Sequence, residues 1–165
     1  MIKVLFDLGL INVMRVGIHK AKIKLKIHPA QKIVGNIPSG KFFEPPSINP
    51  PVGAKSRKTW REGKGHYFGR PLPLNQEPPD WFANPFKNTR AISHKPWWDI
   101  PDFDENLGDI KTVWEASRFD WVIPFAQRAV CGNSEEIVKL NDWLISWSVQ
   151  NPPYLGVNWK CAQEA

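Results

Sequence analysis

Apolar residues recur at helical spacing near the start of the chain, among them Phe6, Leu10, Val13 and Val16. This period predicts an amphipathic helix near residues 3–20. Four lysines alternate with apolar residues over 20–26, a pattern that equally suits a short strand. Because Pro29 and Gly35 punctuate the end of the stretch, we predict a basic, amphipathic helical segment over residues 1–37.

Residues 38–108 have a different texture. They hold 12 of the 16 prolines of the chain, and proline removes backbone donors and stops helices and central strands. The same stretch is rich in aromatic side chains, which a disordered linker rarely is; its tryptophans are Trp60, Trp81, Trp97 and Trp98. We therefore predict an ordered but irregular segment, largely coil, that packs on a larger body.

From residue 109 onward the pattern turns helical. Apolar spacing predicts a helix over 109–131, which Pro124 should kink or break and Gly132 should end as a C′ glycine. Asn133 suits the N-cap of a second helix over 134–150, with Glu136 as its capping-box partner. A third, short helix is expected from residue 158. The pattern as a whole predicts a mainly α fold.

The third helix shows no closing signal before residue 165. Two helices and the start of a third would leave apolar faces without a partner. We therefore expect further helices beyond residue 165. In their absence, the tryptophans expected to be partly exposed are Trp114, Trp121, Trp143 and Trp147.

Charge is distributed unevenly along the 165 residues. Residues 1–70 hold 14 Lys and Arg against 3 Asp and Glu, a net of +11, whereas residues 71–165 hold 8 against 13, a net of −5. The basic half suits an anionic partner: a sulfated or uronic polysaccharide, a nucleic acid or an anionic membrane surface. The acidic second half and the lack of a known nucleic-acid motif argue against nucleic acid.

Cysteine and targeting signals are sparse. Cys131 and Cys161 are too few for a disulfide scaffold or a zinc site with paired spacing, so we expect no metal site. The apolar stretch from Val4 to Ile18 is interrupted by Asp7 and Arg15 and is too short to span a bilayer. It has no clear signal-peptide pattern, and no transmembrane segment is expected.

Five sequence elements resemble, in order, the N-terminal domain of heparinase II/III-type polysaccharide lyases. The run 109–118 (DIKTVWEASR) is similar to the one that opens a toroid helix in that family. The others are 133–136 (NSEE), 146–147 (SW), 151–152 (NP) and 156–159 (GVNW). Upstream, 81–85 (WFANP) and 108–109 (GD) resemble the approach to this series, and residues 8–20 do so less specifically.

The resemblance implies a fold and a reaction. The fold would be the start of an incomplete α/α toroid over residues 109–165, preceded by the Pro/Trp-rich irregular segment over 38–108. The reaction would be β-elimination on a uronic-acid polysaccharide, of the heparan sulfate, alginate or capsule type, with a side-chain amide on the uronate and a Tyr or His as base. It requires no cofactor. The resemblance also implies a soluble bacterial protein, with the periplasm as its expected compartment.

The family's catalytic asparagine belongs to an Asn-Asn-His-Leu type of motif, and its base residues lie further downstream. The one Asn-Trp pair of this chain is Asn158-Trp159, and neither its tyrosines nor its histidines stand in that motif. We therefore assign no catalytic residue and expect this fragment alone to be inactive.

Three pairs of residues are candidate substrate contacts, each beside a structural alternative. Glu115 and Arg118 could bind sugar in a cleft, or form a surface pair on one helix. Asn158 and Trp159 could line the cleft rim, or serve as N-cap and core. Trp97 and Trp98 could form a stacking platform for sugar rings, or only pack. The alternative function is a non-catalytic carbohydrate-binding or scaffold module with tryptophan platforms.

Overall fold

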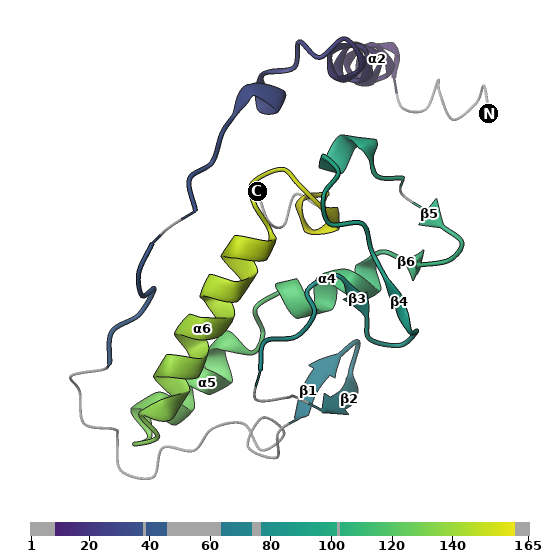
Figure 1. The fold of residues 1–165 in the computed structure, drawn as a ribbon. Helices are drawn as coiled ribbons and strands as arrows, with labels where there is room; N and C mark the ends of the chain where they lie inside the picture. Colours follow the sequence, from purple (N-terminus) through teal and green to yellow (C-terminus); the bar gives the residue numbers. More distant parts are fainter. Residues whose placement is uncertain (1–8, 38, 46–63, 74–76, 102, 161–165) are drawn as a thin grey trace. The chain divides into compact units, whose positions relative to one another are not determined.

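The structure is a computed structural model that describes residues 9–37, 39–45, 64–73, 77–101 and 103–160. The chain divides into two compact units, Met1–Gly35 and Asn36–Ala165 (Figure 1). The irregular segment and the helical region expected from the sequence both fall within the second unit. Each unit is described by itself below.

The described residues of the first unit form the α-helix α2 (Leu10–Lys24) and a short 3-10 helix, η1 (Pro29–Lys32). The N-terminal helix predicted near residues 3–20 is confirmed over residues 10–20, and its predicted part over 3–8 lies outside the described residues. The helix continues to Lys24, so the alternative of a strand at the alternating lysines is wrong. The side-chain amide of Gln31 donates to the Ile23 carbonyl at 3.1 Å and ties η1 back to α2. No side chain of α2 is buried.

In the described ranges of the second unit the α-helices are α4 (Lys111–Ser117), α5 (Val122–Val130) and α6 (Glu135–Gln150). The single helix predicted over 109–131 is therefore wrong, since α4 and α5 are separate. The break lies at Phe119, whose φ of 58° is left-handed and cannot continue a helix. Pro124 does not cause the break. It lies in the first turn of α5, where a backbone N–H would have no partner within the helix.

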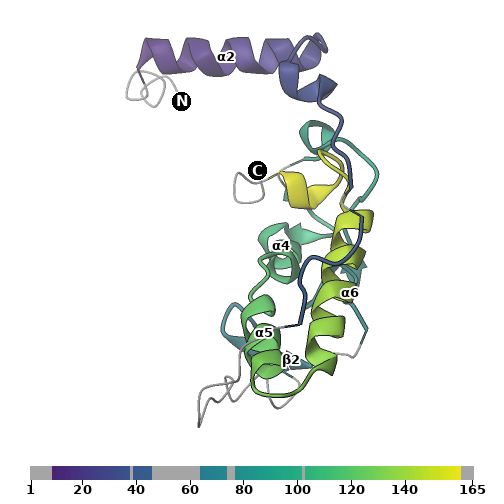
Figure 2. The same cartoon turned by 90° about the vertical axis from the view of Figure 1, so that its left-hand side faces the viewer.

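The turn between α5 and α6 is closed as a Schellman motif. Gly132 has φ 102°. Its backbone N–H donates to the Ala129 carbonyl, and the backbone N–H of Asn133 donates to the Arg128 carbonyl. The predicted C′ glycine is thus confirmed, and α6 begins within one residue of its predicted start. The capping box is wrong, because Ser134 stands at the N-cap without a side-chain bond and Glu136 pairs with Arg128 at 2.5 Å. The two helices pack side by side (Figure 2).

The described part of the irregular segment is organised by short antiparallel ribbons. Their strands are β1 (Lys64–Tyr67) with β2 (Arg70–Pro73), β3 (Ala83–Asn84) with β4 (Thr89–Arg90), and β5 (Phe103–Asp104) with β6 (Gly108–Asp109). Phe68 and Gly69 form the two-residue turn of the first ribbon, both with positive φ (49° and 74°) as a type I′ turn requires. A 3-10 helix, η2 (Trp97–Asp99), follows β4. The fold is thus partly helical, with ordered non-helical structure on its helices.

An aromatic cluster forms the core of the second unit. Trp81 packs between Trp121 and Trp143, with ring centroids 5.8 and 6.1 Å away, and those two rings lie 5.1 Å apart. Trp121 and Trp143 are each only 1% exposed, so the expectation that they would be left partly exposed is wrong. Trp81 comes from the irregular segment and helps to bury both rings. Trp114 and Trp147 are half-buried, as expected.

The last described element is another 3-10 helix, η3 (Val157–Trp159). It begins one residue before the helix predicted from 158, and residues 161–165 lie outside the described part of the chain. Gly156 precedes it with φ 85° and ψ 172°, a conformation essentially restricted to glycine. A Cβ at this position would come within 2.9 Å of the buried Phe82 ring and 3.1 Å of the Ser93 carbonyl oxygen.

We expect Gly156→Ala to destabilise the second unit more than Gly132→Ala does. Both glycines have positive φ, but a Cβ at Gly132 would meet nothing within 4 Å. The control should therefore cost about 1–2 kcal/mol of strain, and the test variant a further ~1–3 kcal/mol because Phe82 is packed. Urea unfolding followed by tryptophan fluorescence measures both. Equal losses would contradict the close approach at Gly156.

Candidate functional site

The last three of the five sequence elements that resemble the lyase family, 146–147, 151–152 and 156–159, meet at one buried pair of side-chain amides. The Asn158 side chain has no exposed surface, and its Nδ2 donates to Asn151 Oδ1 at 2.8 Å and to the Trp81 carbonyl at 3.1 Å. The Asn151 amide in turn donates to the Trp147 carbonyl at 2.9 Å. These bonds join η3, the end of α6 and the irregular segment. Asn158 Oδ1 is buried and has no hydrogen-bond partner.

Two indole N–H groups extend this network to α4 and across η3. Trp114 Nε1 donates to the Val157 carbonyl at 2.9 Å, and Trp159 Nε1 donates to the Asn151 carbonyl at 3.1 Å. Gly156 allows the close turn that brings these groups together. The motif elements at 114, 147, 151 and 156–159 are therefore parts of one hydrogen-bonded node, although 45 positions of sequence separate the first from the last.

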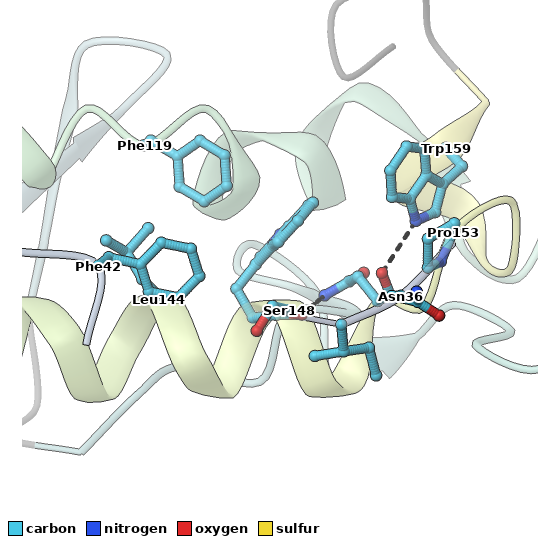
Figure 3. A pocket seen from close by; sticks show the side chains of 10 residues that line it. Asn36, Phe42, Phe119, Leu144, Ser148, Pro153 and Trp159 are labelled. Carbon is cyan, nitrogen blue, oxygen red and sulfur yellow. Dashed lines mark hydrogen bonds between the residues drawn. The ribbon is translucent and has the colours of Figure 1, made fainter. Parts of the chain in front are cut away.

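Beside this node lies a pocket of about 350 Å³ with an aromatic wall. Phe42, Phe119 and Leu144 lie at one end of it, and Pro153, Trp159 and Asn36 at the other (Figure 3). Its remaining lining residues are Ile37, Trp147, Ser148 and Asn151. The volume suits a small molecule or a single sugar ring.

One wall of the pocket is held against α6 by a single asparagine. The backbone N–H groups of Phe42 and Phe43 donate to Asn141 Oδ1 at 2.8 and 2.9 Å, and Asn141 Nδ2 donates to the Phe43 carbonyl at 2.9 Å. Asn141 is buried on α6, so these bonds hold the backbone at Phe42 and Phe43 against that helix. This wall of the pocket is therefore held by hydrogen bonds as well as by apolar contacts.

The polar groups of the pocket are largely used within the protein. Trp147 Nε1 donates to Ser117 Oγ at 2.9 Å, Ser148 Oγ donates to the Ile145 carbonyl, and both ends of the Asn151 side chain are bonded. None of the described lining residues carries a charge. The wall therefore offers ring faces and hydrocarbon, the surface against which the C–H face of a sugar stacks.

Two of the four non-glycine residues with positive φ in the described part of the chain belong to this region, since Phe119 lines the pocket and Tyr154 packs on its lining residue Trp159. Phe119 and Tyr154 have φ values of 58° and 66°, which cost L residues roughly 1–2 kcal/mol each. Phe119 packs edge-on against Trp147 at 5.0 Å, and Tyr154 against Trp159 at 5.5 Å. Strained residues held by their surroundings are frequent at binding sites, which favours the pocket as a functional surface.

Glu115 forms a second, separate centre on α4. Its side chain is only 6% exposed; Oε2 accepts the Phe68 N–H at 2.9 Å and Oε1 lies 2.9 Å from Arg118 Nε. The carboxylate thus fixes the tip of the β1–β2 ribbon to α4. The pKa of Tyr67 is raised to about 12, mainly by burial of its hydroxyl and to a smaller extent by the negative charge of Glu115.

The Trp97–Trp98 pair does not form a flat platform. The two rings are 5.6 Å apart and inclined at 80°, an edge-to-face contact, so a sugar could stack on one of them but not across both. The Trp97 N–H donates to the Tyr154 carbonyl at 3.0 Å, and η2 contacts η3. This places the pair beside the node that holds Asn158 and Trp159.

The six predicted contact residues therefore divide into two groups. The first group is close to η3: Trp97, Trp98, Asn158 and Trp159. Glu115 and Arg118 lie at the β1–β2 ribbon instead. Trp159 lines the pocket, whereas Asn158 is not an N-cap, since it lies inside η3 with Gly156 at the cap position. Substrate contact by these residues stays a prediction.

Sequence reasoning missed Phe42, Phe119 and Tyr67. Phe42 and Phe119 are 77 positions apart, and no local pattern indicates that they line one pocket. For Tyr67 a weak signal exists, since a glycine two residues later suits a tight hairpin turn.

Metal ligands, membrane-spanning helices and related proteins were each sought for this chain. Among the described residues, no three His, Cys, Asp or Glu side chains are grouped to hold a metal ion. No helix in the described ranges has the length and apolar character needed to cross a membrane. Comparison of the chain with protein-family models, curated proteins and solved structures found no match.

We expect the stability of the second unit to fall between pH 10 and 12 in part because of Tyr67. Its pKa is about 12 when folded and 10 in its ordinary state, so the unfolded chain loses this proton first and rising pH favours unfolding. Tyr67→Phe should reduce the slope of unfolding free energy against pH in this window. Tyr154→Phe is the matched control. The same slope in wild type and Tyr67→Phe would contradict the assignment.

Proposed function

We propose that this chain forms part of a polysaccharide lyase of the heparinase II/III type, which cleaves a uronic-acid polysaccharide by β-elimination. In this proposal residues 109–165 begin an α/α toroid and the Pro/Trp-rich segment packs on it. We assign neither the catalytic amide nor the base to a residue of this chain. The chain itself would position and stack the polymer.

The observation that supports this proposal is the convergence of the motif residues. Trp114, Asn151 and Asn158 belong to three separate elements of the resemblance to the lyase family. The Trp114 indole donates to the residue beside Asn158, and Asn158 donates to Asn151, so the three elements meet at one buried node. The match of Gly-x-Asn-Trp also has a physical reason here. The glycine permits a close approach, the asparagine bonds two segments, and the indole N–H closes the turn.

The aromatic pocket also supports an alternative, a carbohydrate-binding module without a reaction of its own. Rings at Phe119, Trp147 and Trp159 line a cavity of single-sugar size. Stacking of a ring face on an aromatic side chain needs no charged residue. The two proposals share this surface and differ in whether the complete protein cleaves the polymer.

We expect the purified 165-residue chain to show no lyase activity. β-Elimination needs a base at C5 of the uronate and a group that stabilises the enolate, and we assign neither to this chain. The measurement is the ultraviolet absorbance of the unsaturated uronate product, with heparan sulfate, alginate and other uronate polymers. Turnover would show that the catalytic residues lie within it. A longer protein that contains this chain and cleaves none of these polymers would favour the module.

Polysaccharide binding should depend on the Trp159 ring. Trp159→Ala should weaken retardation in a polysaccharide-containing gel by roughly tenfold in affinity, because a stacking aromatic is worth ~0.5–1.5 kcal/mol beyond its buried area. Trp159→Phe keeps a ring and should retain most of the binding, although it loses the bond to Asn151. Phe103→Ala, an exposed aromatic on β5, is the control. Equal binding by Trp159→Ala and wild type would argue against the pocket.

A further inference from the structure

The helix α2 carries an apolar stripe that is not buried by any of the described residues of its own unit. Residues 10, 14, 18, 21 and 25 fall within about 100° of one another on a helix with 3.6 residues per turn. They are Leu10, Met14, Ile18, Ala21 and, at the C-cap, Leu25. Leu10 is 77% exposed and Leu25 67%. The stripe thus runs the whole length of α2.

Cations flank the stripe on both sides. By the same helical geometry Arg15 and Lys22 border one edge, and Lys20 and Lys24 border the other. Every charged side chain from residue 9 to residue 35 is Lys or Arg. Long basic side chains at the edges of an apolar stripe can extend to an anionic layer while their stems contact hydrocarbon.

We propose that α2 binds in the plane of an anionic phospholipid surface, with this stripe in the acyl region and the flanking cations at the headgroups. A helix of 15 residues is roughly 22 Å long, which suits a helix lying along the interface. Hydrocarbon and negative charge in the same partner match both features of α2. The inference does not depend on the proposed lyase function.

Other partners fit this surface less well. A polyuronate or a nucleic acid matches the cations but offers no hydrocarbon for Leu10, Met14 and Ile18. A second copy of α2 would cover the stripe, but the residues at its edges are positive on both copies and would repel each other. An anionic lipid surface satisfies the stripe and its edges at once.

The test is co-sedimentation of the full chain with vesicles of phosphatidylcholine, alone or mixed with phosphatidylglycerol. We expect binding to the mixed vesicles, weakened by salt, and at least tenfold weaker binding to the neutral ones, since each surface lysine is worth about 1 kcal/mol on anionic lipid. Absence of binding, or equal binding to both vesicles, overturns the proposal.

Matched substitutions locate the binding face. Ile18→Ser should weaken vesicle binding by about tenfold. Val16→Ser should change it by less than about threefold, because Val16 is similarly exposed and β-branched but lies on the other side of α2. Circular dichroism of both variants checks that α2 has folded. Equal losses in the two variants would overturn the assigned face.

Competition by heparin and the oligomeric state in solution separate the remaining partners. Heparin should displace the chain from vesicles only at low salt, and the affinity of the chain for heparin itself should be unchanged by Ile18→Ser. A heparin affinity that falls with Ile18→Ser to the same extent as vesicle binding would overturn the choice of lipid. So would a dimer in solution that Ile18→Ser disrupts.

Discussion

Burial of tryptophan is the constraint on which the second unit depends. An indole removes a large apolar area from water, but it also carries one N–H that must find an acceptor. Trp81 donates to Ser146 on α6, Trp121 to the Ala116 carbonyl on α4, and Trp147 to Ser117. The bonds of Trp81 and Trp147 connect segments that are 65 and 30 positions apart, and the bond of Trp121 closes the turn from α4 to α5. The rings therefore hold the elements together and also fix which groups face each other.

Asparagine serves a related purpose for the backbone of the proline-rich segment. Proline provides no N–H, so regular ladders cannot satisfy this backbone. Asn84 Nδ2 donates to the Leu107 carbonyl, while its Oδ1 accepts the N–H groups of Phe86 and Lys87. Asn141 donates to and accepts from the backbone at Phe43 in the same manner, and Asn158 donates to the Trp81 carbonyl. A side-chain amide can donate one hydrogen bond and accept another at the same time. This allows an irregular chain to pack with only short strands.

Much of the helical structure could be predicted from local sequence, because periodicity and end signals are local. The bounds of α6 and the glycine at 132 followed from spacing and from the Asn-Pro-Pro stop. The break at Phe119 could not be predicted, since a left-handed phenylalanine has no sequence signal. The burial of Trp121 and Trp143 depends on Trp81, 40 residues upstream of the first. The pocket combines residues from 36 to 159, so its existence is a property of the folded chain alone.

The two proposed surfaces use different physics, and this difference makes them separable. The pocket has ring faces and no charged lining residue among those described, and Arg118, which precedes the lining residue Phe119, is paired with Glu115. Stacking there should depend little on ionic strength. The stripe of α2 lies between cations, and attraction of exposed cations to an anionic layer is screened within about 8 Å at physiological salt. Salt dependence therefore distinguishes lipid binding by α2 from sugar binding at the pocket.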